Sequence, residues 1–373
     1  MFGWFRRRLT RPVSPVAPLA TAPPEPSRSL AGRGPSPESA FMPPAIVPTV
    51  SAEAVESARD RYRATLRRHL RATLAERARA IAADLGRGAH TDEVRAVLDR
   101  VVHADDHTLR PIPTAAQRAL RLARHPLSNL QDVADAFERD PSLAEGLMRM
   151  ANSVWYRVGD TEVDSLHEAL QRTGSSGAEA VILKHTLHHT LCRPGGACEA
   201  MTSQVWLHLT RTASIARELA RGFALDPEAA YLLGLLHDAG KLVLFDTISE
   251  RRRRTRTASP LPFSLLRRML GELHEPLGGL ALLHWGLDPD LAAAVADHHR
   301  RTTPHLPHAA SELLFVAERA DLAIASGTRG DAHEWIARGG LVLDAETLQR
   351  ACHHATEGAL RFTHHEADAL AVA

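Results

Sequence analysis

Cysteine and long apolar runs are both scarce in this sequence. Three cysteines occur among 373 residues, and no two of them form a CxxC pair. This scarcity excludes a disulfide scaffold and a zinc site built from cysteine pairs. No run of about eighteen apolar residues occurs, so the sequence predicts no membrane-spanning helix. We expect a protein of the reducing cytoplasm.

An excess of charge of either sign is also lacking. The 45 lysine and arginine residues face 44 aspartate and glutamate residues, which gives a net charge of +1. A protein that coats nucleic acid would show a strong basic excess, so we expect no nucleic-acid partner. Lysine itself is rare, because only Lys184 and Lys241 occur. Histidine, by contrast, occurs 22 times and is well suited to metal binding near neutral pH.

Residues 1–50 have the composition of a tail. Eleven of the 23 prolines fall between Pro12 and Pro48, mixed with serine, alanine and glycine. Such a segment can neither fill a core nor hold helical hydrogen bonds, so we predict a disordered tail. The start, Phe2 to Arg8, combines aromatic and basic side chains and could contact an anionic membrane surface. A solvated basic tail is the preferred interpretation.

Residues 51–108 form a helical extension in this interpretation. Apolar side chains recur at helical spacing up to Leu85, where Gly86 and Gly88 end the pattern. The apolar stripe comprises Val55, Tyr62, Leu66, Leu70, Leu74, Ile81 and Leu85. A second, shorter helix is predicted over Asp92–Val102. The stripe predicts packing on the rest of the chain, with a dimer seam as the alternative.

The remainder of the chain reads as a series of capped helices. Asp140-Pro141, Asp226-Pro227 and Asp288-Pro289 each place a carboxylate acceptor before a proline at a first helical turn. Alternating strand patterns are nearly absent. The sequence therefore predicts an all-α, multi-helix fold. The basic run Arg251–Arg254 is predicted to lie in a loop between helices.

A His-Asp dipeptide is the strongest local feature. His237 and Asp238 follow two leucines, and adjacent imidazole and carboxylate groups at a helix end can share one divalent metal ion. Gly240 removes side-chain bulk where the helix bends. Lys241 supplies a compact ammonium in a chain that otherwise uses arginine, and this cation could contact a phosphate oxygen.

Further imidazole and carboxylate groups flank the dipeptide on consecutive predicted helices. They are His208, His274, His298 and His299, followed by Glu318 or Asp321. We expect Pro276 to start a new helix directly after His274. The order H…HD…H…HH…(E/D) would converge in a helical bundle, and this donor set suits iron, manganese or zinc. The alternative is a helical core whose histidines only hydrogen-bond between helices.

These motifs resemble the HD superfamily, and more closely its HDOD branch, the HD-related output domains of bacterial signalling proteins. The resemblance covers about residues 109–325. It rests on RPIP at 110–113, ERDPSL at 138–143, LMRMANS at 147–153, the SLxEAL-like 165–170, LGLLHD at 233–238 and HWGL at 284–287. It implies an HD-like helical core with an additional helical subdomain.

The resemblance also implies roles for individual residues. The first metal ligands would be His208, His237 and Asp238; the second set would be His274, His298 and His299. Glu318 stands where the family usually has a closing aspartate, and Asp321, one helical turn later, is the alternative. One or two divalent ions are implied. The paired histidines are not followed by the GYP signature of cyclic-dinucleotide phosphodiesterases, which counts against that activity.

The predicted organisation is a domain over residues 109–327, followed by C-terminal helices over 328–373. The domain divides into a helical subdomain, 109–200, and an HD-like bundle, 201–327. The preferred hypothesis is a cytoplasmic signalling protein with a non-catalytic HDOD module that binds other signalling proteins and associates with itself. The alternative is a metal-dependent phosphohydrolase in which Asp238 and Lys241 serve catalysis.

Overall fold

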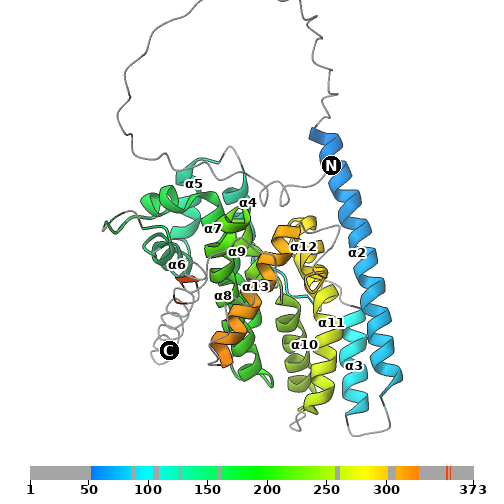
Figure 1. Ribbon diagram of the computed structural model, residues 1–373. Helices are drawn as coiled ribbons and strands as arrows, with labels where there is room; N and C mark the ends of the chain where they lie inside the picture. Colours follow the sequence, from blue (N-terminus) through cyan, green and yellow to red (C-terminus); the bar gives the residue numbers. More distant parts are fainter. Residues whose placement is uncertain are drawn as a thin grey trace, which may run out of the picture.

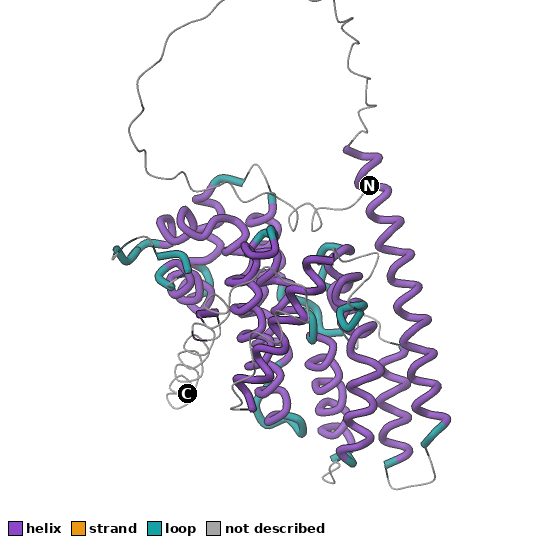
Figure 2. Tube along the Cα trace, in the orientation of Figure 1, coloured by secondary structure: helices purple, strands orange, loops and turns teal. Residues whose placement is uncertain are grey.

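The protein is helical throughout the part described by its computed structural model. That part comprises residues 52–85, 90–103, 109–125, 128–153, 155–157, 159, 161–256, 261–300 and 308–326, with 350, 351 and 353. Every regular element in these ranges is a helix (Figure 2), which confirms the all-α prediction. The predicted tail, residues 1–50, and nearly all of the predicted C-terminal helices, 328–373, lie outside the described residues.

The first part of the domain packs three short helices against a long one. They are α4 (Thr114–Arg124), α5 (Leu130–Glu138), α6 (Pro141–Ala151) and α7 (Leu166–Leu191). The side chain of Asp140 caps α6 by accepting from the backbone N–H groups of Ser142 and Leu143, with the proline at the first helical position, as predicted. Gly174, at a φ of +68°, kinks α7.

The second part is the bundle that carries the histidines. Its elements are α8 (Glu199–Leu219), η1 (Ala220–Phe223), α9 (Pro227–Leu236), α10 (Ala239–Thr255), α11 (Phe263–His284), α12 (Pro289–Ala296) and α13 (His308–Ser326). Two expectations are wrong here. Pro276 lies inside the continuous helix α11 and does not start a new one. The run Arg251–Arg254 belongs to the last turns of α10, where Glu250 and Glu93 bind three of its guanidinium groups.

A buried cluster joins the two parts. Arg217 of α8 places its guanidinium over the ring of Tyr231, 3.8 Å from the centroid, and donates to Glu228 at 2.9 Å. The hydroxyl of Tyr156, from the segment between α6 and α7, donates to the same carboxylate. A buried arginine therefore has both an anion and aromatic faces as partners, which offsets the cost of removing it from water.

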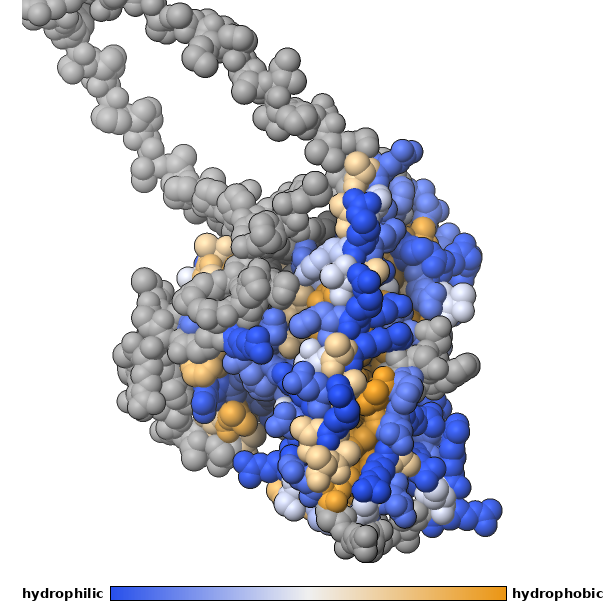
Figure 3. All heavy atoms as spheres, turned by 90° about the vertical axis from the view of Figure 1, so that its right-hand side faces the viewer, coloured by the Kyte–Doolittle hydropathy of each residue, from blue (hydrophilic) through white to orange (hydrophobic). Residues whose placement is uncertain are grey.

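The N-terminal extension forms two helices, α2 (Ala52–Ala83) and α3 (Thr91–Val102). Helix α2 runs along α11 and α12 at one side of the bundle (Figure 1). Leu66, Leu70 and Leu74 of the predicted stripe are buried, so this part of the stripe packs within the chain. The solvent-exposed face of α2 is mainly hydrophilic (Figure 3). No helix among the described residues is long and apolar enough to cross a membrane.

Candidate metal centre

Glycines allow the helices of the site to approach each other closely. A Cβ atom at Gly240, in the first turn of α10, would overlap the carbonyl oxygen of His274 and lie 2.7 Å from the backbone nitrogen of Gly278 on α11. A Cβ atom at Gly234 on α9 would lie 2.7 Å from the Cα atom of Ala213 on α8. The backbones thus meet where only glycine fits, and this brings the His-Asp dipeptide against α8 and α11.

Three histidines are oriented by their own helices. The Nδ1 atoms contact backbone carbonyl oxygens one turn back: Gly234 for His237 at 2.8 Å, Leu270 for His274 at 2.6 Å, and Val295 for His298 at 2.7 Å. A carbonyl oxygen only accepts, so each Nδ1 carries the hydrogen. The Nε2 atom of each ring is then the one directed into the site, which is the arrangement seen for metal-binding histidines.

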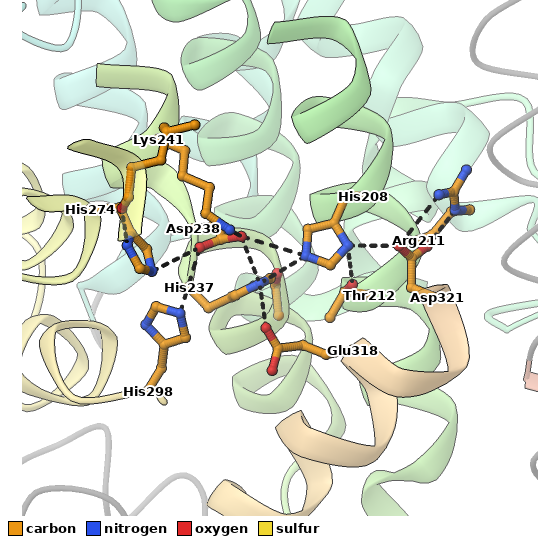
Figure 4. A network of polar contacts seen from close by, with 12 residues as sticks. His208, Arg211, Thr212, His237, Asp238, Lys241, His274, His298, Glu318 and Asp321 are labelled. Atoms are coloured by element: carbon orange, nitrogen blue, oxygen red, sulfur yellow. Dashed lines mark hydrogen bonds and ion pairs between the residues drawn. The ribbon is translucent and has the colours of Figure 1, made fainter. Parts of the chain in front are cut away.

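The Nε2 atoms of four histidines converge on Asp238. Those of His208 and His237 lie 3.6 and 3.5 Å from its Oδ2 atom. Those of His274 and His298 lie 3.4 and 3.5 Å from its Oδ1 atom. The rings come from α8, the end of α9, α11 and the turn after α12, and Figure 4 shows them around the carboxylate. One carboxylate thus faces two pairs of imidazoles.

The two acidic side chains of α13 have different positions in the site. Glu318 places its Oε1 atom 3.3 Å from Nε2 of His237. Asp321 lies behind His208, with Oδ2 2.6 Å from Nδ1, and the guanidinium of Arg211 binds the same carboxylate. Glu318 therefore faces the histidine cluster, whereas Asp321 orients His208 from the other side of its ring (Figure 4).

His299 extends the cluster toward the solvent. Its Nε2 atom lies 3.0 Å from that of His274, and its backbone N–H donates to Glu275 at 3.3 Å. Three groups of side chains in the described residues place ligand atoms within 4.8 Å of one another. They are Asp238 with His274, His298 and His299; His208 with His237 and Asp238; and His237 with His298 and Glu318.

Ion pairs and burial separate the pKa values of these groups. Burial lowers the pKa of His237, but Asp238 and Glu318 outweigh it and raise that pKa to about 10. Burial raises the pKa of Glu318, but the hydrogen bond and charge of His237 lower it to about 2. For His274 burial dominates and lowers the pKa to about 3, so this imidazole is neutral at neutral pH and its Nε2 lone pair is available.

Two buried polar atoms of the site have no hydrogen-bond partner among the described residues. They are Asp238 Oδ1 and His298 Nε2, which face each other at 3.5 Å. Leaving a buried acceptor unsatisfied is costly, so such atoms point to a group that binds between them. Imidazole nitrogens and carboxylate oxygens are ligands for divalent iron, manganese or zinc. The side chains present therefore fit a metal ion.

Several side chains of the site are partly exposed to solvent, whereas its central carboxylate is buried. The side chains of Lys241, Glu318 and His208 keep 25%, 20% and 18% of their surface exposed, whereas that of Asp238 keeps 1%. The ammonium group of Lys241 donates to Asp238 Oδ2. Lys241 therefore places a cation at a partly exposed part of the site.

All seven predicted ligands come together in the structure. The seven are His208, His237, Asp238, His274, His298, His299 and Glu318. Arg211 and Glu275 were missed. Arg211 stands three residues after His208 on one helix, a spacing that could have indicated it; nothing distinguished Glu275. The ring pair His185 and His189, 4.2 Å apart on α7, belongs to no ligand group of the described residues.

The sequence model of the HDOD domain matches residues 109–301, more than half of the 373 residues. The chain belongs to the HDOD family. A comparison with curated proteins found no match for this HDOD protein. Its N-terminal helices α2 and α3 precede the matched region.

Two solved structures share the fold. A protein from Shewanella amazonensis described as a metal-dependent phosphohydrolase is 19% identical, with a TM-score of 0.56 over 71% of this chain and 96% of that one. A second, described as a phosphohydrolase from the same organism, is 19% identical, with a TM-score of 0.50 over 70% and 93%. A signal transduction protein from Marinobacter aquaeolei is 21% identical, with a TM-score of 0.48 over 78% and 64%.

Proposed function

We propose that this HDOD protein binds divalent metal in the centre around Asp238 and acts as a regulatory protein in signalling. The convergence of four Nε2 atoms on one buried carboxylate carries the metal-binding part. A core that used its histidines only for hydrogen bonds between helices would satisfy Asp238 Oδ1 and His298 Nε2, and neither atom has a hydrogen-bond partner among the described residues. Membership of the HDOD family supports the signalling part.

The regulatory hypothesis assigns the metal a structural role. The ligand groups combine residues from α8, α9, α10, α11, α13 and the turn after α12, so each bound ion would tie several of these elements together. Binding would then stabilise the bundle and the surface that other signalling proteins recognise. In this proposal the partners are such proteins, and a second copy of the chain is one of them.

A second candidate function is the hydrolysis of a phosphoester, which the position of Lys241 favours. A bound divalent ion would supply a nucleophilic hydroxide and polarise the phosphoryl group. Two residues of the chain would balance the charge of the metal and bind the phosphate. Asp238, which belongs to two ligand groups, would balance the charge of the bound metal, and the partly exposed Lys241 would exchange its bond with Asp238 for one with a phosphate oxygen. The two Shewanella amazonensis proteins are described as phosphohydrolases, which adds support.

The metal content of the purified full-length protein tests the proposal. We expect stoichiometric iron, manganese or zinc in the wild type and its loss in His237→Ala and Asp238→Ala. The control is His185→Ala, which removes a histidine of α7 outside the ligand groups and should keep the metal. A wild type that holds no metal after reconstitution with each of the three ions would refute metal binding.

Phosphoesters and nucleotides, screened with added manganese or iron, separate the two functions. Turnover that disappears together with the metal in Asp238→Ala, and that falls in Lys241→Met while the metal stays, would establish hydrolysis. A metal-loaded protein without turnover that retains its partners would support the regulatory role.

A further inference from the structure

A carboxylate on α11 connects the histidine cluster to the N-terminal helix. Glu275 accepts a hydrogen bond from the backbone N–H of His299 on its Oε1 atom, at 3.3 Å. Its other oxygen, Oε2, accepts from the guanidinium of Arg77 on α2, at 3.1 Å. The same guanidinium nitrogen donates to the carbonyl oxygen of Glu272, at 2.9 Å. Arg77, Glu275 and His299 thus form a chain of hydrogen bonds that ends at a ligand candidate.

The hydrogen bond from the His299 N–H to Glu275 anchors a part of the cluster that lies outside the helices. Helix α12 ends at Ala296, so His299 lies in the turn beyond it, and residues 301–307 are outside the described part. The ring of His299 is opposite His274 only if this turn keeps its place. The Glu275 side chain is 11% exposed, and a carboxylate this buried needs a cation to remain in position. Arg77 supplies that cation.

We infer that Arg77 is a positioning residue for the His274–His299 end of the metal centre. Through Glu275 it fixes the backbone of His299, so the docking of α2 sets the distance between two ligand atoms that lie on the HDOD domain. Helix α2 precedes residues 109–301, the part that the family model matches. The N-terminal extension therefore contributes to the centre without reaching it. The expected effect of Arg77 on metal affinity rests on the proposed function, whereas its expected effect on the backbone of His299 does not.

Another arginine of α2 provides a matched control. Arg67, three turns earlier, donates to the backbone carbonyl of Leu283 on α11 at 3.3 Å. It is half-buried like Arg77 and joins the same two helices. It has no contact with Glu275 or with the turn after α12 among the hydrogen bonds of the described residues. A purely structural role in docking α2 would give both arginines the same effect.

Hydrogen–deuterium exchange on the metal-free, full-length protein tests the geometry. We expect Arg77→Ala to speed exchange of the amides at 297–300 by about tenfold or more, because the His299 N–H loses its fixed acceptor. Arg67→Ala should leave this segment unchanged, and Arg77→Lys should restore part of the protection, since it keeps the charge. Equal exchange at 297–300 in wild type and Arg77→Ala, with α2 still protected, would overturn the inference.

Titration with Mn²⁺ tests the consequence for the centre. Loss of a residue that supports a ligand typically lowers metal affinity about 10- to 100-fold, and we expect this for Arg77→Ala but not for Arg67→Ala. If both variants bind Mn²⁺ like the wild type, the inference is wrong while the proposed function holds. If the wild type binds neither Mn²⁺ nor, on reconstitution, iron or zinc, but exchange at 297–300 responds as expected, the proposed function fails and the positioning role of Arg77 is supported.

Discussion

Asp321 contacts His208 on the ring atom that faces away from Asp238: its Oδ2 atom lies 2.6 Å from Nδ1, while Nε2 points into the cluster. This contact fixes the tautomer of His208, because an ionised carboxylate only accepts. We predict that Asp321→Asn lowers metal affinity about 10- to 100-fold without unfolding the protein. Competition with a metal indicator measures it. Asp60→Asn, an exposed position of α2, is the control, and equal affinities in the two variants would contradict the role.

Gly240 sets the distance between α10 and α11. A methyl group at this position overlaps the His274 carbonyl, and the obstruction is backbone that cannot rotate away. We predict that Gly240→Ala lowers the free energy of unfolding by about 3 kcal/mol or more. It should also move His274 of α11 away from Asp238. Gly271→Ala, on the open face of α11 with nothing within 4 Å of its added methyl group, should gain about 0.5–1 kcal/mol. Urea unfolding of both variants checks the pair.

Arg217, the buried cation of the cluster that joins the two parts of the domain, can be tested separately. Arg217→Met leaves the Glu228 carboxylate without its guanidinium, and breaking such a buried pair costs about 3–5 kcal/mol. Arg149→Met removes an exposed partner of Glu145, with 45% and 53% of the side chains exposed, and should cost about 0.5 kcal/mol or less. Thermal and urea unfolding give both values. Similar losses of unfolding free energy in the two variants would show that the buried pair of Arg217 and Glu228 contributes little to stability.

His188 makes stability depend on pH. Burial, followed by the charges of His189 and Lys184, lowers its pKa from 6.5 to about 4. The unfolded chain therefore binds more protons than the folded one between these values, and stability falls as the pH drops from about 6.5 toward 4.

We predict that between pH 7 and pH 4.5 the wild type loses about 2 kcal/mol more than His188→Gln. Urea unfolding at both pH values measures the difference. His69→Gln, at an exposed position of α2, should follow the wild type. Parallel losses in wild type and His188→Gln would assign the pH dependence to other groups.

The order of the ligand candidates could be read from the sequence because local signals carry it. The Asp-Pro caps at residues 226 and 288 fix where α9 and α12 begin, and His237 and His298 follow the ends of these two helices. The choice between Glu318 and Asp321 could not be made. The two residues lie about one turn apart on α13, and only the rotation of this helix against α8 decides which carboxylate faces the cluster.

The helix through Pro276 was missed for a different reason. A proline normally ends a helix because it removes one hydrogen bond and crowds the preceding turn. Here α11 continues, with every residue from Leu273 to Leu283 buried, so packing outweighs the local preference. The link from Arg77 to Glu275 joins residues 198 positions apart. No spacing rule relates such positions, and only the assembled bundle brings them together.

Helix α2 has a consequence for the order in which this protein is made. Its contacts with the bundle join residues that are 184 to 229 positions apart. At about 5–20 residues per second, a ribosome needs roughly 10–40 s to supply the partner helices after α2 has emerged. During that interval Leu66, Leu70 and Leu74, which the finished bundle buries, lack α11 and α12. The first helix of the described residues is thus among the last to pack against its partners, and its apolar stripe lacks these two helices until then.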